Sequence, residues 1–155
     1  MSSESSSALY IHWKTYQDAK IGIRIDYPSN EYFVTPIPFE GVVSGAHIQS
    51  DDYIQFGDKK ITIEGVRIGD NMAEGNGIQL YQTKDSNILD YLQQYKPFAT
   101  KKMVNGTDYQ QFEFVGMGDV YGYVTKKNGQ YFVFESMWGP NNSVSEKMLQ
   151  SLRFE

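Results

Sequence analysis

Cysteine is absent from the 155 residues of this chain. Its absence excludes a disulfide framework, a thiolate nucleophile and a zinc site built on cysteine. No apolar run approaches the roughly 18 residues that a membrane-spanning helix needs. Histidine is scarce as well, and His12 and His47 do not stand at the spacing of metal ligands. We therefore expect no bound metal ion and no cofactor.

Concentrated positive charge is also missing. The formal net charge is −5, and the lysine pairs at 59–60, 101–102 and 126–127 lie far apart in the sequence. Proteins that bind nucleic acid normally carry a basic face or stripe. We therefore expect no nucleic-acid partner and interpret the lysine pairs as solvated loop charge.

Aromatic residues are abundant and make up 15% of the chain. They favour β-strands, and alternation of apolar and polar residues marks a half-buried strand. Residues 21–27 alternate in this way until Pro28, and Asn105-Gly106 and Asn128-Gly129 are typical of two-residue hairpin turns. Strands are predicted at 9–13, 21–27, 46–49, 53–56, 60–68, 78–82, 98–104, 109–115, 120–125, 130–138 and 152–154, with an irregular crossing segment at 29–45.

Two segments have helical periodicity. Asp85 or Ser86 can cap the first helix, and Ser143 with Glu146 matches the capping box at the start of the second. Their apolar faces are predicted to be Ile88, Leu89, Leu92 and Tyr95 in the first helix, and Val144, Met148 and Leu152 in the second, with Leu149 beside them. Two helices packed on a mostly antiparallel sheet define an α+β fold.

Residues 1–8 form a serine-rich, low-complexity segment, which we expect to be a disordered tether ahead of one domain at 9–155. A tether of this kind follows the lipidated cysteine of bacterial lipoproteins. Our hypothesis is that the chain begins just after such a cysteine. The alternative is a natural disordered N-terminus, and the upstream gene sequence distinguishes the two.

Catalytic patterns are weak. No Gly-x-Ser-x-Gly elbow is present to place a nucleophile. Glu113 and Glu135 fall in strands of the same predicted meander and, if opposed, could approach the roughly 5 Å separation of a retaining glycosidase. Glutamate on the outward face of a sheet is also the usual way to keep that face soluble. We predict that the protein is not an enzyme, and a small glycosidase-like hydrolase using these two residues is the alternative.

The aromatic residues offer a further interpretation. Most are expected on half-exposed sheet faces of a β-rich fold, where tyrosine is well tolerated. An exposed aromatic surface could instead bind carbohydrate or cell wall. The candidate binding residues are Tyr121, Tyr123, Tyr131 and Trp138.

Two sequence runs stand near the ends of the expected domain, YQDAKIGIRIDYP at 16–28 and MLQSLRF at 148–154. They resemble the opening and closing motifs of the PsbP-like family of small bacterial envelope lipoproteins. Asn105-Gly106 falls where such proteins often have a hairpin after the middle helix. The chain departs from the family at Glu31-Tyr32-Phe33, where a tryptophan commonly follows the Tyr-Pro pair.

The resemblance implies an α/β/α sandwich around an antiparallel sheet. It also implies a protein without catalysis, because the family's photosystem II extrinsic proteins, envelope lipoproteins and Ran-binding member act by binding partners. We therefore expect an accessory protein of the bacterial cell envelope, extracytoplasmic and lipid-anchored or secreted. We expect it to be a monomer that engages a protein partner, and to touch the membrane only through an N-terminal lipid anchor outside this chain.

Overall fold

The computed structural model describes the backbone of residues 12–37, 39–43, 46–50, 52–69, 77–93, 96–114, 120–137 and 143–155, and the side chains of 12–37, 52–69, 77–93, 101–113, 122–136 and 143–155. Its strands are β1 (Trp13–Asp18), β2 (Ile23–Pro28), β3 (Phe33–Ile37), β4 (Phe39–Val43), β5 (Ala46–Ser50), β6 (Tyr53–Phe56), β7 (Lys59–Thr62), β8 (Glu64–Gly69), β9 (Gly77–Thr83), β10 (Lys96–Val104), β11 (Thr107–Phe114), β12 (Val120–Lys127), β13 (Gln130–Met137) and β14 (Arg153–Phe154). Its helices are α2 (Asn87–Leu92) and α3 (Ser143–Ser151).

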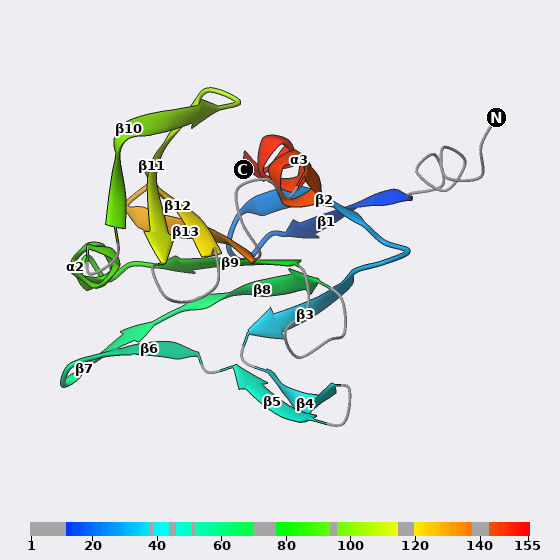
Figure 1. The fold of residues 1–155 in the computed structure, drawn as a ribbon, viewed down its shortest axis with the longest axis horizontal. Coiled ribbons are helices and arrows are strands. Elements are labelled where there is room, and N and C mark those ends of the chain that lie inside the picture. The colour runs from blue at the N-terminus through cyan, green and yellow to red at the C-terminus, as the bar shows by residue number, and fades with distance from the viewer. Residues whose placement is uncertain are drawn as a thin grey trace.

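Every described strand pair is antiparallel. Seven strands form the main sheet in the order β10-β11-β12-β13-β9-β8-β3, and three form a second sheet in the order β1-β2-β14. The pairs β4-β5 and β6-β7 are separate hairpins. Figure 1 shows the second sheet and α3 over one face of the main sheet, with the two hairpins on the other side.

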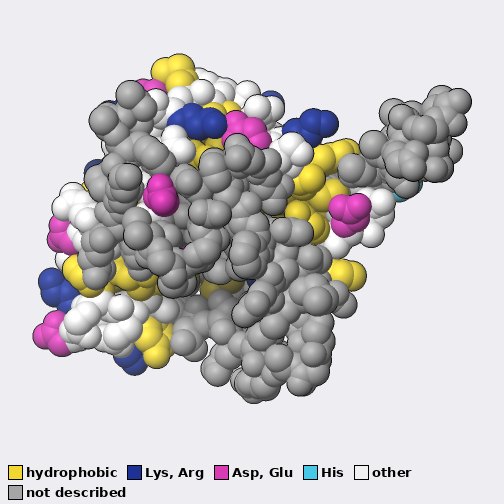
Figure 2. Space-filling view, in the orientation of Figure 1, with side chains coloured by type: hydrophobic (Ala, Val, Ile, Leu, Met, Phe, Trp, Pro, Cys, Tyr) yellow, Lys and Arg dark blue, Asp and Glu magenta, His cyan; other side chains and the backbone are white. Residues whose placement is uncertain are grey.

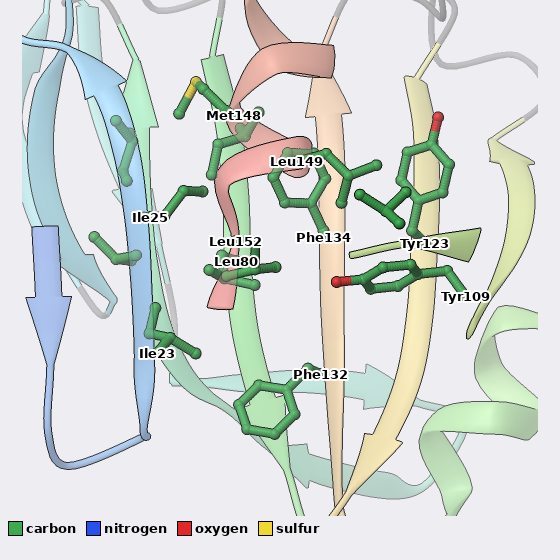
Figure 3. Close-up of a cluster of buried hydrophobic side chains, with 14 of the residues drawn as sticks. Ile23, Ile25, Leu80, Tyr109, Tyr123, Phe132, Phe134, Met148, Leu149 and Leu152 are labelled. Carbon is green, nitrogen blue, oxygen red and sulfur yellow. The ribbon is translucent and has the colours of Figure 1, made fainter. Parts of the chain in front are cut away.

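The first core lies between the main sheet, the second sheet and α3. Figure 3 shows part of it, with α3 crossing over the strands. This core is defined by Ile21, Ile23, Ile25, Tyr32, Val66, Ile68, Ile78, Leu80, Val104, Tyr109, Tyr123, Phe132, Phe134, Met148, Leu149 and Leu152. Met148 and Leu149 of α3 and Ile23 and Ile25 of β2 are each fully buried. The alternation that predicted a strand at 21–27 therefore exists because β2 turns one side to this core and the other to solvent.

The second core lies on the opposite face of the main sheet. It is defined by Ile37, Ile61, Ile63, Tyr81, Ile88, Leu92, Phe112, Val124 and Val133. Helix α2 and hairpin β6-β7 contribute to it, and they contact each other through an edge-to-face pair of Phe56 and Tyr91. Strands β9, β12 and β13 are thus covered on both faces, as central strands of a buried sheet must be.

The predicted α/β/α sandwich, with helices packed on the sheet, is wrong. The described residues are mostly antiparallel strand, and the two helices are only six and nine residues long. The first face is covered by a second sheet together with α3, and hairpin β6-β7 shares the second face with α2. A period-two pattern shows that a strand has one buried side, but it does not show which sheet the strand joins.

The irregular segment predicted at 29–45 is also wrong in part, because β3 and β4 lie within it. Pro36 is unfavourable within a strand, because proline cannot donate a hydrogen bond to a neighbouring strand. Among the strands that the structure describes, β3 pairs only with β8 and forms an edge of the main sheet, where a proline is tolerated because one side of the strand needs no ladder. Likewise, the single strand predicted at 60–68 is divided at Ile63 into β7 and β8, which join different sheets.

The two hairpin turns are confirmed. Asn105 and Gly106 have φ of 52° and 76°, and Asn128 and Gly129 have φ of 52° and 77°. Two consecutive residues with positive φ form the turn whose twist matches antiparallel strands, and Asn-Gly is the dipeptide that tolerates it best.

Both helices form where the sequence predicts them, but the buried face and the cap of α2 differ in part from the prediction. Met148 and Leu149 are buried in α3 as expected, whereas Leu89 of α2 is 37% exposed and does not belong to the buried face. The Asp85 carboxylate accepts a bond from the backbone N–H of Asn87 at 2.9 Å, and Ser86 makes no capping bond. Tyr95 lies outside the described residues.

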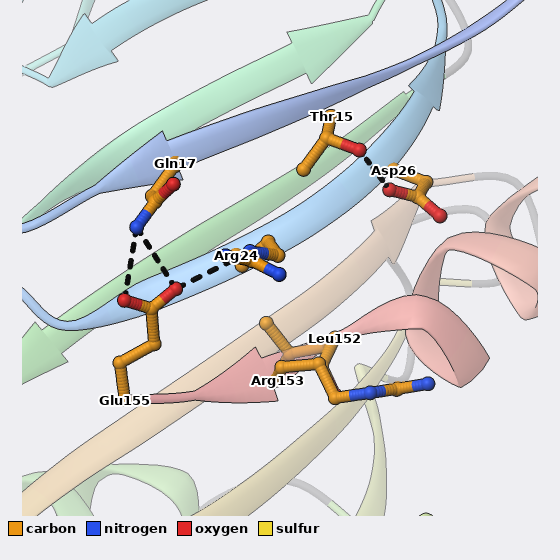
Figure 4. A network of polar contacts seen from close by, with 7 residues as sticks. All are labelled: Thr15, Gln17, Arg24, Asp26, Leu152, Arg153 and Glu155. Atoms are coloured by element: carbon orange, nitrogen blue, oxygen red, sulfur yellow. Dashed lines mark hydrogen bonds and ion pairs between the residues drawn. The ribbon is translucent and has the colours of Figure 1, made fainter.

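The C-terminal strand closes the second sheet (Figure 4). The Glu155 carboxylate accepts bonds from Nε2 of Gln17 at 2.9 and 3.0 Å and pairs with Nε of Arg24 at 3.3 Å. The backbone N–H of Glu155 donates to the carbonyl of Gly22 at 2.9 Å. These contacts hold β14 against β2, so that Leu152 is buried at the end of α3.

Candidate functional site

The two glutamates considered for hydrolysis lie on opposite faces of the main sheet. Phe112 pairs with Gly122, and Gly122 pairs with Glu135, so these three residues share one row and one face. Glu113 is the next residue of β11 and therefore points to the other face. The carboxylate pair predicted for a glycosidase does not form, because a one-residue offset in β11 places the sheet itself between the two groups.

Glu135 instead faces the second core. It is half-buried, and its carboxylate accepts a hydrogen bond from the Tyr81 hydroxyl of β9. Burial raises the pKa of Glu135 to about 7, because the charged form loses its hydration, and the bond from Tyr81 lowers the pKa by a smaller amount. The carboxyl group therefore changes its protonation state near neutral pH.

The neighbours of Glu135 follow from the strand register. The ring of Phe112 lies across Gly122, which has no side chain to obstruct it. On the other side Glu135 pairs with Gln79, and the same row continues through Arg67 of β8 to Thr35 of β3. The apolar ring of Phe112 therefore lies on the β12 side of the carboxyl, and polar residues continue the row toward β3 at the edge of the sheet.

The aromatic residues predicted to bind carbohydrate do not share a surface where the structure describes them. Tyr123 is only 4% exposed and packs in the first core between Tyr109 and Phe134. Tyr131 is half-buried on the opposite face, with Nζ of Lys126 5.4 Å from its ring centre. Trp138 and the side chain of Tyr121 lie outside the described residues.

The histidines do not form part of this site. His12 is exposed, and its backbone N–H donates to the side-chain oxygen of Asn30 at 3.3 Å. The side chain of His47 lies outside the described residues. Among the side chains that the structure describes, no three His, Asp or Glu residues gather closely enough to hold a metal ion.

The described surface carries mixed charge. On the face seen in Figure 2, lysine, arginine, aspartate and glutamate side chains are interspersed between the parts that are not described. Two large apolar side chains stand out on the edge strands of the main sheet: Phe33 of β3 is 59% exposed and Met103 of β10 is 67% exposed. No described helix is long and apolar enough to cross a membrane.

The sequence identified Glu135 as a candidate residue, but it did not show that Glu135 faces the second core and bonds to Tyr81. The Asn128-Gly129 turn already places Glu135 opposite Gly122, because a two-residue hairpin fixes the register of both strands. The turn alone therefore shows that Glu135 lies opposite Gly122, a residue without a side chain. The contribution of Phe112 could not be derived in this way, because the connection at 115–119 has no turn signature that fixes the register of β11.

Comparison with known proteins supports the fold. No protein-family model matches the chain, and no curated protein sequence matches it either. A solved structure, cyanobacterial PsbP (CyanoP) from Synechocystis sp. PCC 6803, is similar with a TM-score of 0.54 and 14% sequence identity, over 94% of each chain. The fold is therefore PsbP-like, and the resemblance found in the short motifs is confirmed at the level of fold.

Proposed function

We propose that this chain is a non-enzymatic accessory protein that acts by binding a protein partner. The observation that carries the proposal is the similarity to CyanoP, which extends over 94% of both chains. It is an argument from fold, and one fold can host different functions. The chain's own sites therefore have to be consistent with it.

The geometry of the glutamates is consistent with binding. A retaining hydrolase needs two carboxylates about 5 Å apart in one cleft. Here Glu113 and Glu135 are on opposite faces, and Glu135 is engaged by Tyr81 in the second core. The hydrolase alternative loses the residue pair on which it was based.

We also propose that the protein works outside the cytoplasm, in the bacterial cell envelope, as a lipid-anchored monomer. The serine-rich composition of residues 2–7 supports a tether, and the PsbP-like fold is compatible with this location. Fractionation of the native host, with detection of the lipid by metabolic labelling, tests it. Recovery of the native protein in the cytoplasmic fraction without lipid would contradict it.

Partner capture tests the main proposal. Tagged chain is incubated with native membranes, cross-linked with a short amine-reactive reagent and analysed by mass spectrometry. We expect at least one envelope protein whose cross-links to this chain disappear when untagged chain is added in excess. A folded protein of similar size and net charge serves as control. The proposal fails if the chain cross-links no protein above that control, or if the purified chain cleaves a glycosidic substrate.

A further inference from the structure

Glu135 occupies an unusual position for an acidic residue. It lies in β13, which has β12 on one side and β9 on the other, and each face of these strands is covered by a core. Within the described residues, its polar partner is the hydroxyl of Tyr81, which is itself only 2% exposed. A carboxyl in such a place is stable when neutral and costly when charged.

Compensating charge would be needed to hold Glu135 ionised. On its own row the cation is Arg67, which lies two strands away beyond Gln79. The other elements on this face are α2, with Asp90 and Tyr91, and hairpin β6-β7, with Tyr53, Lys59 and Lys60. None of these groups shares a described hydrogen bond or ion pair with the Glu135 carboxyl, whose pKa is governed by burial and by Tyr81.

Gly122 leaves space for the ring of Phe112 next to Glu135. Because position 122 has no side chain, the ring of Phe112 covers the β12 side of the row that contains Glu135. The carboxyl is therefore between an aromatic wall from β11 and a phenol from β9. Ionisation of Glu135, in β13, therefore introduces a negative charge among groups from β9, β11 and β12 of the main sheet.

We propose that Glu135 is a proton-dependent latch in the second core, which is closed when the carboxyl is protonated and weakened when it is ionised. In the closed state the neutral carboxyl packs between Phe112 and Tyr81, and on ionisation the bond from Tyr81 offsets only part of the lost hydration. In the ionised state the second core is less stable, and the main sheet opens more often on this face.

The direction of the pH dependence follows from proton linkage. The folded-state pKa of Glu135 is raised from 4.5 to about 7, so the folded chain binds more protons than the unfolded chain between these values. The stabilisation that Glu135 contributes is fully present below about pH 4.5 and is lost as the pH rises toward 7. Above pH 7 the titration of Glu135 no longer changes the free energy of unfolding. The unfolding equilibrium constant should rise by up to roughly two orders of magnitude across this window.

Unfolding profiles of matched variants test the latch. Denaturant midpoints are measured from pH 4.5 to 8.5 for the native chain, Glu135→Gln and Glu113→Gln. Glu113 is the control, because it is also a half-buried glutamate of the main sheet but lies on the face away from the second core. We expect the native chain and Glu113→Gln to lose stability together as pH rises. Glu135→Gln should lack this loss and exceed the native chain at pH 8.

A direct titration keeps the proposal testable if Glu135→Gln does not fold. The side-chain carboxyl of Glu135 is followed by ¹³C NMR in the unaltered chain, with Glu113 observed in the same sample. A midpoint near neutral pH for Glu135 supports the latch. A midpoint near the ordinary value of 4.5 overturns it, as does a Glu135→Gln profile that runs parallel to that of the native chain.

Discussion

Gly122 and Phe112 fit together so closely that a Cβ atom at position 122 would lie 2.0 Å from Cζ of Phe112. The ring is 2% exposed and has no room to withdraw without disturbing the second core. We therefore predict that Gly122→Ala destabilises the domain by about 1–3 kcal/mol through overpacking. Chemical denaturation of the single variant measures the loss.

A double-mutant cycle identifies the cause of that loss. Phe112→Leu removes the atoms that meet the new Cβ, so the cost of Gly122→Ala should be smaller in the Phe112→Leu background. Equal costs in both backgrounds would show that the glycine is required for a reason other than the ring.

The hydrogen bond from Tyr81 gives a second prediction. The bond stabilises the ionised form of Glu135 and lowers its pKa, while burial raises it. Tyr81→Phe removes the donor and keeps the ring, so the titration midpoint of Glu135 should move above its native value of about 7. NMR titration of the variant measures the shift, and a midpoint that moves downward would contradict the assigned contact.

A third prediction concerns the anchoring of α3. Met148 is fully buried in the first core, whereas Gln150 of the same helix is exposed. Met148→Ala should cost about 2–5 kcal/mol, because it leaves a cavity between α3 and the two sheets. Gln150→Ala should change stability by less than about 0.5 kcal/mol. Similar losses in the two variants would contradict the packing of α3 described here.

The edge strands allow the binding surface to be located. Phe33 and Met103 are exposed on opposite edges of the main sheet, so replacing either with serine should leave stability within about 0.5 kcal/mol of the native value. If the partner docks at one edge, only the variant at that edge should lose cross-links to it. Equal retention of all cross-links in both variants would show that neither edge is used.

Local features of the fold could be predicted from the sequence because their causes are local. Asn105-Gly106 and Asn128-Gly129 form turns because this dipeptide accepts positive φ at both positions. Met148 and Leu149 could be placed in the core from helical spacing alone. The family resemblance in the motifs at 16–28 and 148–154 also predicted the likeness to a PsbP structure, although the α/β/α sandwich that it implied is wrong.

Features that depend on distant pairing could not be predicted. The proline in β3 is acceptable only because that strand is at an edge, and the sequence does not show which strand is outermost. The break at Ile63 reflects the joining of β7 and β8 to different partners. The faces of Glu113 and Glu135 depend on the register between β11 and β12, which the connection at 115–119 leaves open to sequence reasoning.

The most direct test of the proposed function is equilibrium binding of the purified chain to the purified protein that cross-linking identifies. The account predicts saturable binding at a fixed stoichiometry, with a dissociation constant at or below about 1 µM, where the binding free energy is roughly −8 kcal/mol. Binding that does not saturate, or that a protein of equal charge reproduces, would contradict it.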